Sequence, residues 1–118
     1  MKDSRKFRMH WNNYRYRKEA DGIVIEEYEG EELHIVIPSE IEGLPVRKIA
    51  PEAFSTHGAL SETIEVPGTV TEIGDGAFKM CMSLEKLLLQ EGVQKIGENV
   101  LLVTAVTKMY LPASVSEL

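Results

Sequence analysis

Apolar residues recur along the chain at long, regular intervals, and this pattern dominates the sequence. Three columns of apolar residues repeat at steps of 22 to 24 positions: Ile49, Ile73 and Ile96; Phe54, Phe78 and Leu101; and Val70, Val93 and Val115. A period of this length is typical of one supersecondary unit stacked on copies of itself. The pattern therefore predicts a solenoid, which presents an extended surface rather than a pocket.

Each repeat begins with a predicted strand whose alternate residues point inward. The inward pairs are Ile35 and Ile37, Ile64 and Val66, Leu87 and Leu89, and Met109 and Leu111. Three of these four strands are followed by a proline, at Pro38, Pro67 and Pro112. Proline lacks an N–H group and suits the end of a strand, so the prolines set the strand ends.

The rest of each repeat is clearest in the central unit. A second extended piece at 70–73 leads to a corner at Gly74, which Gly97 repeats in the next unit. A short helical or 3-10 turn then directs Ala77 and Phe78 inward. The next strands open at three apolar positions, Leu60, Leu84 and Val106. These elements predict a right-handed solenoid of parallel strands, dominated by β-structure.

Residues 7–32 precede the repeats and show a shorter alternation. Two strand-like runs lie here, marked by Phe7, Met9, Trp11, Tyr14 and Tyr16 and by Ile23, Val24, Ile25 and Tyr28. The Asp21-Gly22 pair between them predicts a tight turn, so we expect a β-hairpin cap. We divide the chain into a cap, 1–32, and an array of about 3.5 units, 33–59, 60–83, 84–105 and 106–118, with residues 41–46 looping out.

Composition narrows the classes that the chain can belong to. Its 118 residues suit one domain, and a hydrophobic content of 43% suits a packed protein rather than a disordered one. No apolar run is long enough to cross a membrane, and the N-terminus lacks the apolar stretch of a secretory signal. Cys81 is the only cysteine, which excludes an intrachain disulfide and indicates a buried structural thiol.

The repeat resembles the BspA-like leucine-rich repeat family of bacterial proteins. The family's unit is matched by Ile64, Val66, Pro67, Val70, Ile73, Gly74, Ala77, Phe78, Cys81 and Leu84. Its usual opening phrase is matched by Tyr28, Gly30, Ile37, Pro38, Ile41, Gly43, Pro45, Val46 and Ile49. The resemblance covers about residues 21–118. It implies a leucine-rich repeat solenoid. Because the family is mostly described as surface or secreted proteins that bind other proteins, often as adhesins, it also implies binding without catalysis.

No set of reactive residues has the spacing of a catalytic or metal site. Residues 74–76 lack the third glycine of a dinucleotide fingerprint, and the acidic stretch 26–32 lacks the ligand spacing of a calcium loop. The histidines have no metal-ligand spacing with Cys81 or with one another: His10, His34 and His57. We therefore predict no enzyme, no catalytic residue, no metal and no cofactor.

Charge is distributed unevenly along the chain. Residues 1–18 carry seven bases and one acid, whereas the remainder carries six bases and eighteen acids. Bases interleaved with aromatic residues are the ingredients of a nucleic-acid-binding surface, which is one alternative. We favour a cap whose aromatic residues cover the first coil and whose bases balance the acids of residues 19–42. The acidity of the remaining surface also opposes phosphate binding.

Outward residues of the strands align into a candidate partner surface. One column holds Val36, Glu65, Leu88 and Tyr110, and its neighbour holds His34, Thr63, Lys86 and Lys108. Three residues of the first column are apolar or aromatic, and an exposed apolar stripe beside charge is a mark of a protein interface. The alternative is a strand surface without a partner, because such residues also suit strands.

The last coil continues the inward pattern without a further coil to cover it. Its inward residues are Val106, Met109, Leu111, Val115 and Leu118. We expect these residues to associate with a second copy, giving a homodimer or a larger assembly through residues 100–118. The sequence thus predicts a non-enzymatic protein–protein interaction module. A self-assembling structural fragment and nucleic-acid binding through the basic hairpin are the alternatives.

Overall fold

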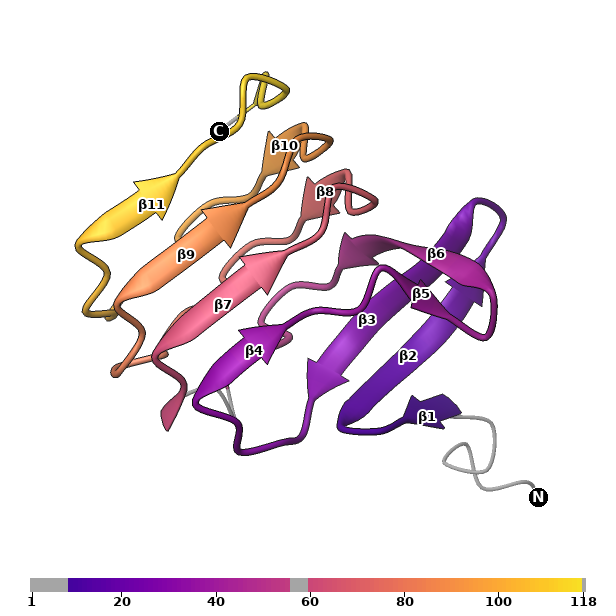
Figure 1. Cartoon of the computed structure of the whole chain (residues 1–118), viewed down its shortest axis with the longest axis horizontal. Coiled ribbons are helices and arrows are strands. Elements are labelled where there is room, and N and C mark those ends of the chain that lie inside the picture. The colour runs from indigo at the N-terminus through magenta and orange to yellow at the C-terminus, as the bar shows by residue number, and fades with distance from the viewer. Residues whose placement is uncertain (1–8, 56–59, 118) are drawn as a thin grey trace.

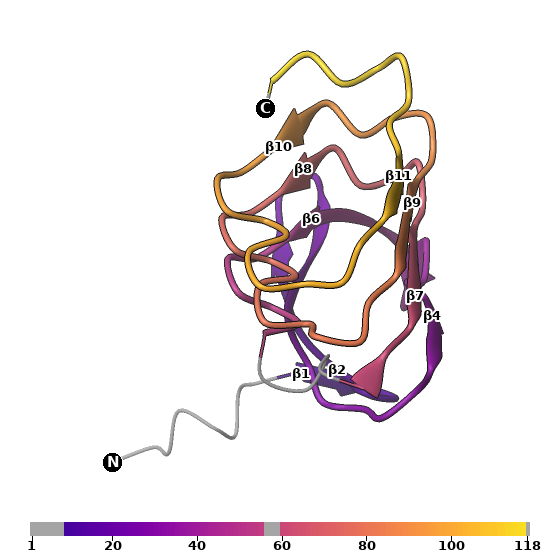
Figure 2. The same cartoon turned by 90° about the vertical axis from the view of Figure 1, so that its left-hand side faces the viewer.

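The chain folds into a β-solenoid of about four coils, and the repeat pattern is confirmed. This computed structural model describes residues 9–55 and 60–117. Strands lie on two sides of each coil, and turns close the third side (Figures 1 and 2). Within the described ranges, no helix is long and apolar enough to cross a membrane.

One side of the solenoid is a four-stranded parallel sheet. Its strands are β4 (His34–Val36), β7 (Thr63–Val66), β9 (Lys86–Leu89) and β11 (Lys108–Tyr110). They are ordered β11-β9-β7-β4, so neighbouring strands come from successive repeats. Ile35, Ile64, Leu87 and Met109 stand opposite one another in register, as the inward alternation predicts.

The other sheet combines the N-terminal strands with the second extended piece of each repeat. It contains β1 (Met9–Trp11), β2 (Tyr14–Glu19), β3 (Gly22–Tyr28), β6 (Leu44–Ile49), β8 (Glu72–Ile73) and β10 (Lys95–Ile96) in that spatial order. Figure 2 shows β6, β8 and β10 facing the four-stranded sheet across the interior. β3 pairs directly with β6, so this sheet runs without a break from the N-terminal strands into the repeats. The division of the chain into a cap and an array at residue 32 stays a prediction.

The third side of each coil is made of tight turns rather than a full turn of α-helix. In the central coil, the N–H groups of Ala77 and Lys79 donate to the carbonyls three residues earlier. Those carbonyls belong to Gly74 and Gly76. Gly74 is required at its corner because a Cβ there would lie 2.6 Å from the backbone nitrogen of Pro51 in the preceding coil.

The N-terminal region has one strand more than the predicted hairpin. β1 and β2 are joined by Asn12-Asn13, and β2 and β3 are joined by Ala20-Asp21. The predicted Asp-Gly turn is therefore displaced by one residue, since Gly22 pairs with Glu19 and begins β3. The chain before Met9, including the predicted strand residue Phe7, lies outside the described residues.

The extra residues of the first repeat form a second, smaller hairpin. β5 (Glu40–Ile41) pairs antiparallel with the start of β6. The turn between them uses Glu42 at a φ of 55° and Gly43 at a φ of 77°, which suits a two-residue hairpin turn. The insertion loops out as predicted, but Ile41 and Val46 at its base are buried in the core.

An aromatic column links the N-terminal strands to the repeats. Successive ring centroids are 6.4 Å apart from Trp11 to Tyr14 and 5.4 Å apart from Tyr14 to Tyr28. From Tyr28 to Phe54 and from Phe54 to Phe78 the separation is 5.2 Å. Pairs at these distances stabilise beyond their burial by about 0.5–1.5 kcal/mol each. The predicted role of the N-terminal aromatics in covering the first coil is therefore visible in the packing.

The opening position of the second repeat's strand was predicted one residue too early. Leu60 is 60% exposed, whereas Ser61 is 1% exposed and occupies the interior position of Leu84. The first repeat has ten steps from Phe54 to Ile64, and the next has nine from Phe78 to Leu87, which shifts the alignment. The buried hydroxyl of Ser61 donates to the carbonyl of Glu32 at 2.6 Å, which satisfies its polarity.

Candidate interaction surface

The outward column of the four-stranded sheet forms as the sequence predicts. Register places Val36 opposite Glu65, Glu65 opposite Leu88, and Leu88 opposite Tyr110. We call these four residues the outer stripe. Val36 is 68% exposed and Tyr110 is 51% exposed, while Glu65 and Leu88 are half-buried. Neighbouring strands are about 4.8 Å apart, so the stripe holds its side chains at fixed spacing.

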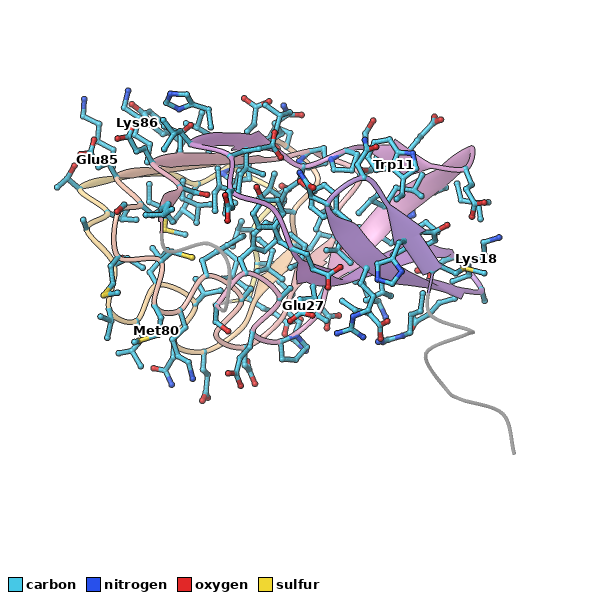
Figure 3. All side chains as sticks on the ribbon, turned by 90° about the horizontal axis from the view of Figure 1, so that it is seen from below. Trp11, Lys18, Glu27, Met80, Glu85 and Lys86 are labelled. Atoms are coloured by element: carbon cyan, nitrogen blue, oxygen red, sulfur yellow. The ribbon has the colours of Figure 1, made fainter. Side chains whose placement is uncertain are left out.

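A polar row runs beside the outer stripe. His34 Nδ1 lies 2.9 Å from Thr63 Oγ1, and Lys86 stands directly opposite Lys108. Among the residues that the structure describes, no carboxylate lies within 4.0 Å of either lysine nitrogen. Figure 3 shows Lys86 on the outside of the sheet, away from Met80 on the turn side. Within the described residues, the two lysines therefore place positive charge without an ion-pair partner next to the stripe.

Glu65 is the one charged member of the outer stripe, and it is held in place by the next coil. The side-chain amide of Gln90 donates to Glu65 Oε2 at 3.0 Å. The amide oxygen of Gln90 accepts from the N–H of Gly68 at 3.3 Å. Gln90 stands where other repeats have proline, so this departure from the pattern ties two coils together.

The last coil is less covered than those before it. Three of its predicted inward residues, Val106, Met109 and Val115, are partly buried against the core. Leu111 is 49% exposed, although Val66 and Leu89 in the same column are 0% and 5% exposed. Leu118 lies outside the described residues.

The bases of the N-terminal strands are engaged with carboxylates of the same region. Arg15 Nη2 lies 3.4 Å from Glu27, and Arg17 Nη1 lies 3.1 Å from Glu26. The Arg17 guanidinium donates to Glu19, which lowers the pKa of that carboxyl. This neutralisation agrees with the predicted balance of charge.

The aromatic residues of that region are also engaged in the core. Tyr14 and Tyr16 are buried, at 4% and 3% exposure, and so offer no face on which a nucleic-acid base can stack. Burial, aided by a hydrogen bond to Glu42, raises the pKa of Tyr16 to about 12. The basic residues before Met9 lie outside the described part of the chain.

The residues considered for catalysis have structural roles where the structure describes them. Burial raises the pKa of the Cys81 thiol to about 12, and its Sγ lies 3.5 Å from the carbonyl oxygen of Phe54. Asp75, in the stretch 74–76, accepts the N–H of Glu98 in the next coil at 2.8 Å. The described residues contain no group of three or more His, Cys, Asp or Glu side chains that fits a metal ion. His57 lies outside them.

Sequence reasoning missed a groove beside β4. It has a volume of about 430 Å³ and is lined by Trp11, Asn12, Asn13, Tyr14, Glu32, Val36 and Pro38. The first four residues come from the β1–β2 turn and the strand ends beside it. The other three lie in β4 or within two residues of it in the sequence. Only the fold of the three N-terminal strands brings them together, so no spacing in the sequence indicates the groove.

Comparisons with known proteins agree with this geometry. The family model for the BspA type leucine rich repeat region matches residues 33–118, in six copies. No curated protein matches the chain.

Three crystal structures share the fold. A leucine-rich repeat protein of T. pallidum aligns at a TM-score of 0.80 and 27% identity, over 92% of this chain and 52% of that one. A leucine-rich repeat protein of Bacteroides capillosus aligns at 0.81 and 26%, over 93% and 86%. A leucine rich cell surface protein of Faecalibacterium prausnitzii aligns at 0.72 and 25%, over 93% and 38%. The chain therefore spans about half, or less, of two of these relatives.

Proposed function

The chain belongs to the BspA-type leucine-rich repeat family, and from this premise we propose that it is a non-enzymatic module that binds another protein across the outer stripe. One observation carries the proposal: Val36 and Tyr110, at the two ends of the stripe, are 68% and 51% exposed. Large apolar and aromatic side chains in a row, next to charge, are typical of a binding surface on an otherwise polar exterior.

The charges beside the stripe indicate the kind of partner. Lys86 and Lys108 are adjacent on parallel strands, and they raise the potential along one side of Leu88 and Tyr110. A partner surface with acidic residues next to an apolar patch would neutralise the lysines and cover the stripe. This arrangement favours a protein partner whose contact surface carries local negative charge.

The place where the module works is also a proposal. The similar protein of Faecalibacterium prausnitzii is described as a cell surface protein. We propose a cell-surface or secreted setting, with adhesion as the biological role, because a rigid sheet that displays side chains in columns suits contact with another surface. An epitope tag detected on intact cells would support this location, and detection only after lysis would contradict it.

Binding across the stripe is tested with charge reversal at matched positions. The immobilised full chain is used to capture proteins from cell-surface extracts, in parallel with the double variant Lys86→Glu, Lys108→Glu and with Tyr110→Ala. Lys95→Glu is the control, because Lys95 is also an exposed strand lysine but lies on β10 in the other sheet. We expect a partner that binds the wild type and the control and is lost from both face variants. Equal capture by all four proteins would contradict the proposal.

Self-association through the last coil is a second candidate function. Leu111 is 49% exposed in a column whose earlier members are buried, and no described strand pairs with the outer edge of β11. Two copies that bring these ends together around a twofold axis would cover Leu111, Met109 and Val106. Light scattering is expected to show a dimer or larger assembly that Leu111→Lys dissociates. A monomer at micromolar concentration would contradict this candidate.

A further inference from the structure

Strand β4 has a free edge on the side of the N-terminal strands. It is the last strand of its sheet and pairs only with β7 among the described strands. The N–H of Ile37 donates to Glu65, and the carbonyl of Leu33 accepts from Glu62. Because backbone groups alternate in direction along a strand, those of His34 and Val36 point away from β7, toward the free edge.

The groove lies along this free edge. Figure 1 shows β4 as the last strand of its sheet, on the side where β1, β2 and β3 lie. In the other sheet, β3 and β2 continue past the first coil, but no described strand does so beside β4. The space is left as the groove of about 430 Å³, a size within the usual range of ligand sites, about 300–1,000 Å³.

The apolar walls of the groove come from Trp11 and Val36, which are 37% and 68% exposed. The Trp11 ring is stacked on Tyr14 at a centroid distance of 6.4 Å, and Tyr14 in turn packs on the aromatic column. Burial of Tyr14, helped by the nearby charge of Glu32, raises its pKa, so its hydroxyl stays neutral. Trp11 is thus an exposed aromatic side chain stacked on the end of the column, and tryptophan is among the residues that dominate binding energy at interfaces.

One carboxylate, that of Glu32, lines the groove and accepts two hydrogen bonds. Glu32 Oε1 accepts from the Asn13 amide at 3.4 Å and from the Tyr28 hydroxyl at 3.3 Å. The Tyr28 hydroxyl also accepts the backbone N–H of Glu32 at 2.9 Å. No lysine or arginine is among the residues that line the groove. Among the described residues, the groove therefore combines an apolar wall, a strand edge without a partner strand and one carboxylate with no basic side chain beside it.

From these features we infer that β4 accepts an extended segment of another protein as an added strand. The segment places an aliphatic side chain between Trp11 and Val36 and a lysine or arginine side chain at Glu32. Backbone hydrogen bonds to His34 and Val36 supply affinity, and the side chains supply specificity. Pro38 has no N–H to offer, so the added strand is short and gains about four backbone hydrogen bonds at most.

This inference goes beyond the proposed function because it concerns a strand edge rather than the outer face of the sheet. The two surfaces share Val36 but differ in every other residue. The partner of the outer stripe is expected to be acidic there, whereas the segment at β4 is basic. Variants of Trp11 and Glu32 test the groove, and variants of Lys86, Lys108 and Tyr110 test the stripe, so either idea fails without the other.

Intrinsic fluorescence gives a direct test, since Trp11 is the only tryptophan in the chain. The full chain is titrated with the blocked peptide Thr-Val-Arg-Val-Thr, with the same peptide carrying Glu in place of Arg, and with a version carrying Pro in place of the second Val. We expect a saturable change in emission with the arginine peptide. Binding of the other two should be weaker by about tenfold or more, because one loses the charge pair and the other loses a backbone donor.

Variants with matched controls assign the binding to the groove, with anisotropy of a labelled arginine peptide as the readout. Trp11→Ala is compared with Met9→Ala, since Met9 is on the same strand and is 38% exposed but does not line the groove. Glu32→Gln is compared with Glu31→Gln, its exposed neighbour. We expect Trp11→Ala to weaken binding by about tenfold or more and Met9→Ala to leave it unchanged. Glu32→Gln should remove the preference for arginine over glutamate in the peptide, and Glu31→Gln should keep it.

Several results would overturn the inference. They include no saturable change up to millimolar arginine peptide, and equal losses in the test and control variants. An emission of Trp11 that depends on protein concentration alone would show that a second copy fills the groove. A further variant replaces four basic residues together by Gln in the full chain: Lys2, Arg5, Lys6 and Arg8. If the Trp11 emission of this variant shifts without peptide, the groove binds the chain's own N-terminal segment.

Discussion

The two ends of this solenoid are finished in different ways. At the N-terminal end, β2 and β3 continue one sheet past the first coil, and Tyr14 and Tyr28 continue its aromatic column. At the C-terminal end, the described part of the last coil pairs with the same sheet through one isolated bridge, between Glu117 and Lys95. Leu111 is 49% exposed there, whereas Val66, at the same position of the second coil, is fully buried.

In a stacked protein, whether an apolar residue is buried depends on the coil or cap that lies next to it and not on the residue alone. The same apolar position is core when a coil or cap lies on it, and surface when none does. The N-terminal strands do not repeat the sequence pattern, yet they supply the hydrogen bonds and rings that a preceding coil would supply. The five predictions that follow break or sharpen this contrast, beginning with the largest effect.

The same substitution in one column should have opposite outcomes at the two ends. Val66→Asp places a carboxylate at a fully buried position and is expected to prevent folding. Leu111→Asp, at 49% exposure, is expected to change stability by about 1 kcal/mol or less. Circular dichroism and urea unfolding of both variants measure this. A folded Val66→Asp protein of normal stability would contradict the assigned core.

The aromatic column should be more sensitive near the cap than at its far end, in the third unit. Phe54→Ala removes a ring that packs on both Tyr28 and Phe78, and is expected to cost about 3–5 kcal/mol. Leu101→Ala, in the same column but partly exposed, should cost less than about 2 kcal/mol. Chemical denaturation measures both values. Similar losses at the two positions would mean that the ends are equally covered.

Thiol reactivity should distinguish the covered coil from the open one. Cys81 is fully buried, while Thr104, its counterpart in the next repeat, is half-buried. At pH 8, a thiol reagent should reach Cys81 of the native chain only when the fold opens around it. The cysteine of a Thr104→Cys variant, made in a Cys81→Ala background, should react faster by about a hundredfold. Equal rates would contradict the difference in cover.

The same thiol also gives a pH dependence. Its pKa in the folded chain is raised by burial from 9.0 to about 12, so the folded state favours the neutral form. Below pH 9 the thiol is neutral in both states and stability is unaffected. Between pH 9 and about 12 the unfolded chain loses the proton first, and stability falls as pH rises. Cys81→Ala should show a smaller fall over this range in urea unfolding.

The smallest effect is expected from the charges on the N-terminal strands. Arg17 lies 3.1 Å from Glu26 but its side chain is 49% exposed, so water and salt screen the pair. Arg17→Gln is expected to lower the free energy of unfolding by less than about 1 kcal/mol, with the difference vanishing at high salt. A larger, salt-independent loss would show that the ion pairs hold the cap in place more than the aromatic column does.

Much of the repeat could be predicted from its sequence. The inward columns, the outward columns and the corner at Gly74 follow from spacing, because each coil rests on a near copy of itself. The strand register could therefore be assigned without coordinates, and so could the row formed by Lys86 and Lys108. The spacing does not reveal whether a partner binds to these outward columns, since exposed apolar residues also occur on strands that bind nothing.

The misplaced features lie where one repeat differs in length from the next. A single extra residue before Ile64 moves the interior position from Leu60 to Ser61, and the burial of Ser61 and its hydrogen bond to Glu32 reveal the shift. The groove at Trp11 was missed for a related reason. Its residues come from a turn and a strand that are far apart in sequence and have no repeat to align them.

Hydrogen exchange, read strand by strand in dilute protein, tests most directly the claim that one end is covered and the other is open. The amides of β7 should exchange only through global unfolding, and those of β3 nearly as slowly, because strands lie on both sides of each. The amides of β11 should exchange faster by about a hundredfold or more through local opening. Protection of β11 equal to that of β7 in a protein shown to be monomeric would contradict the account.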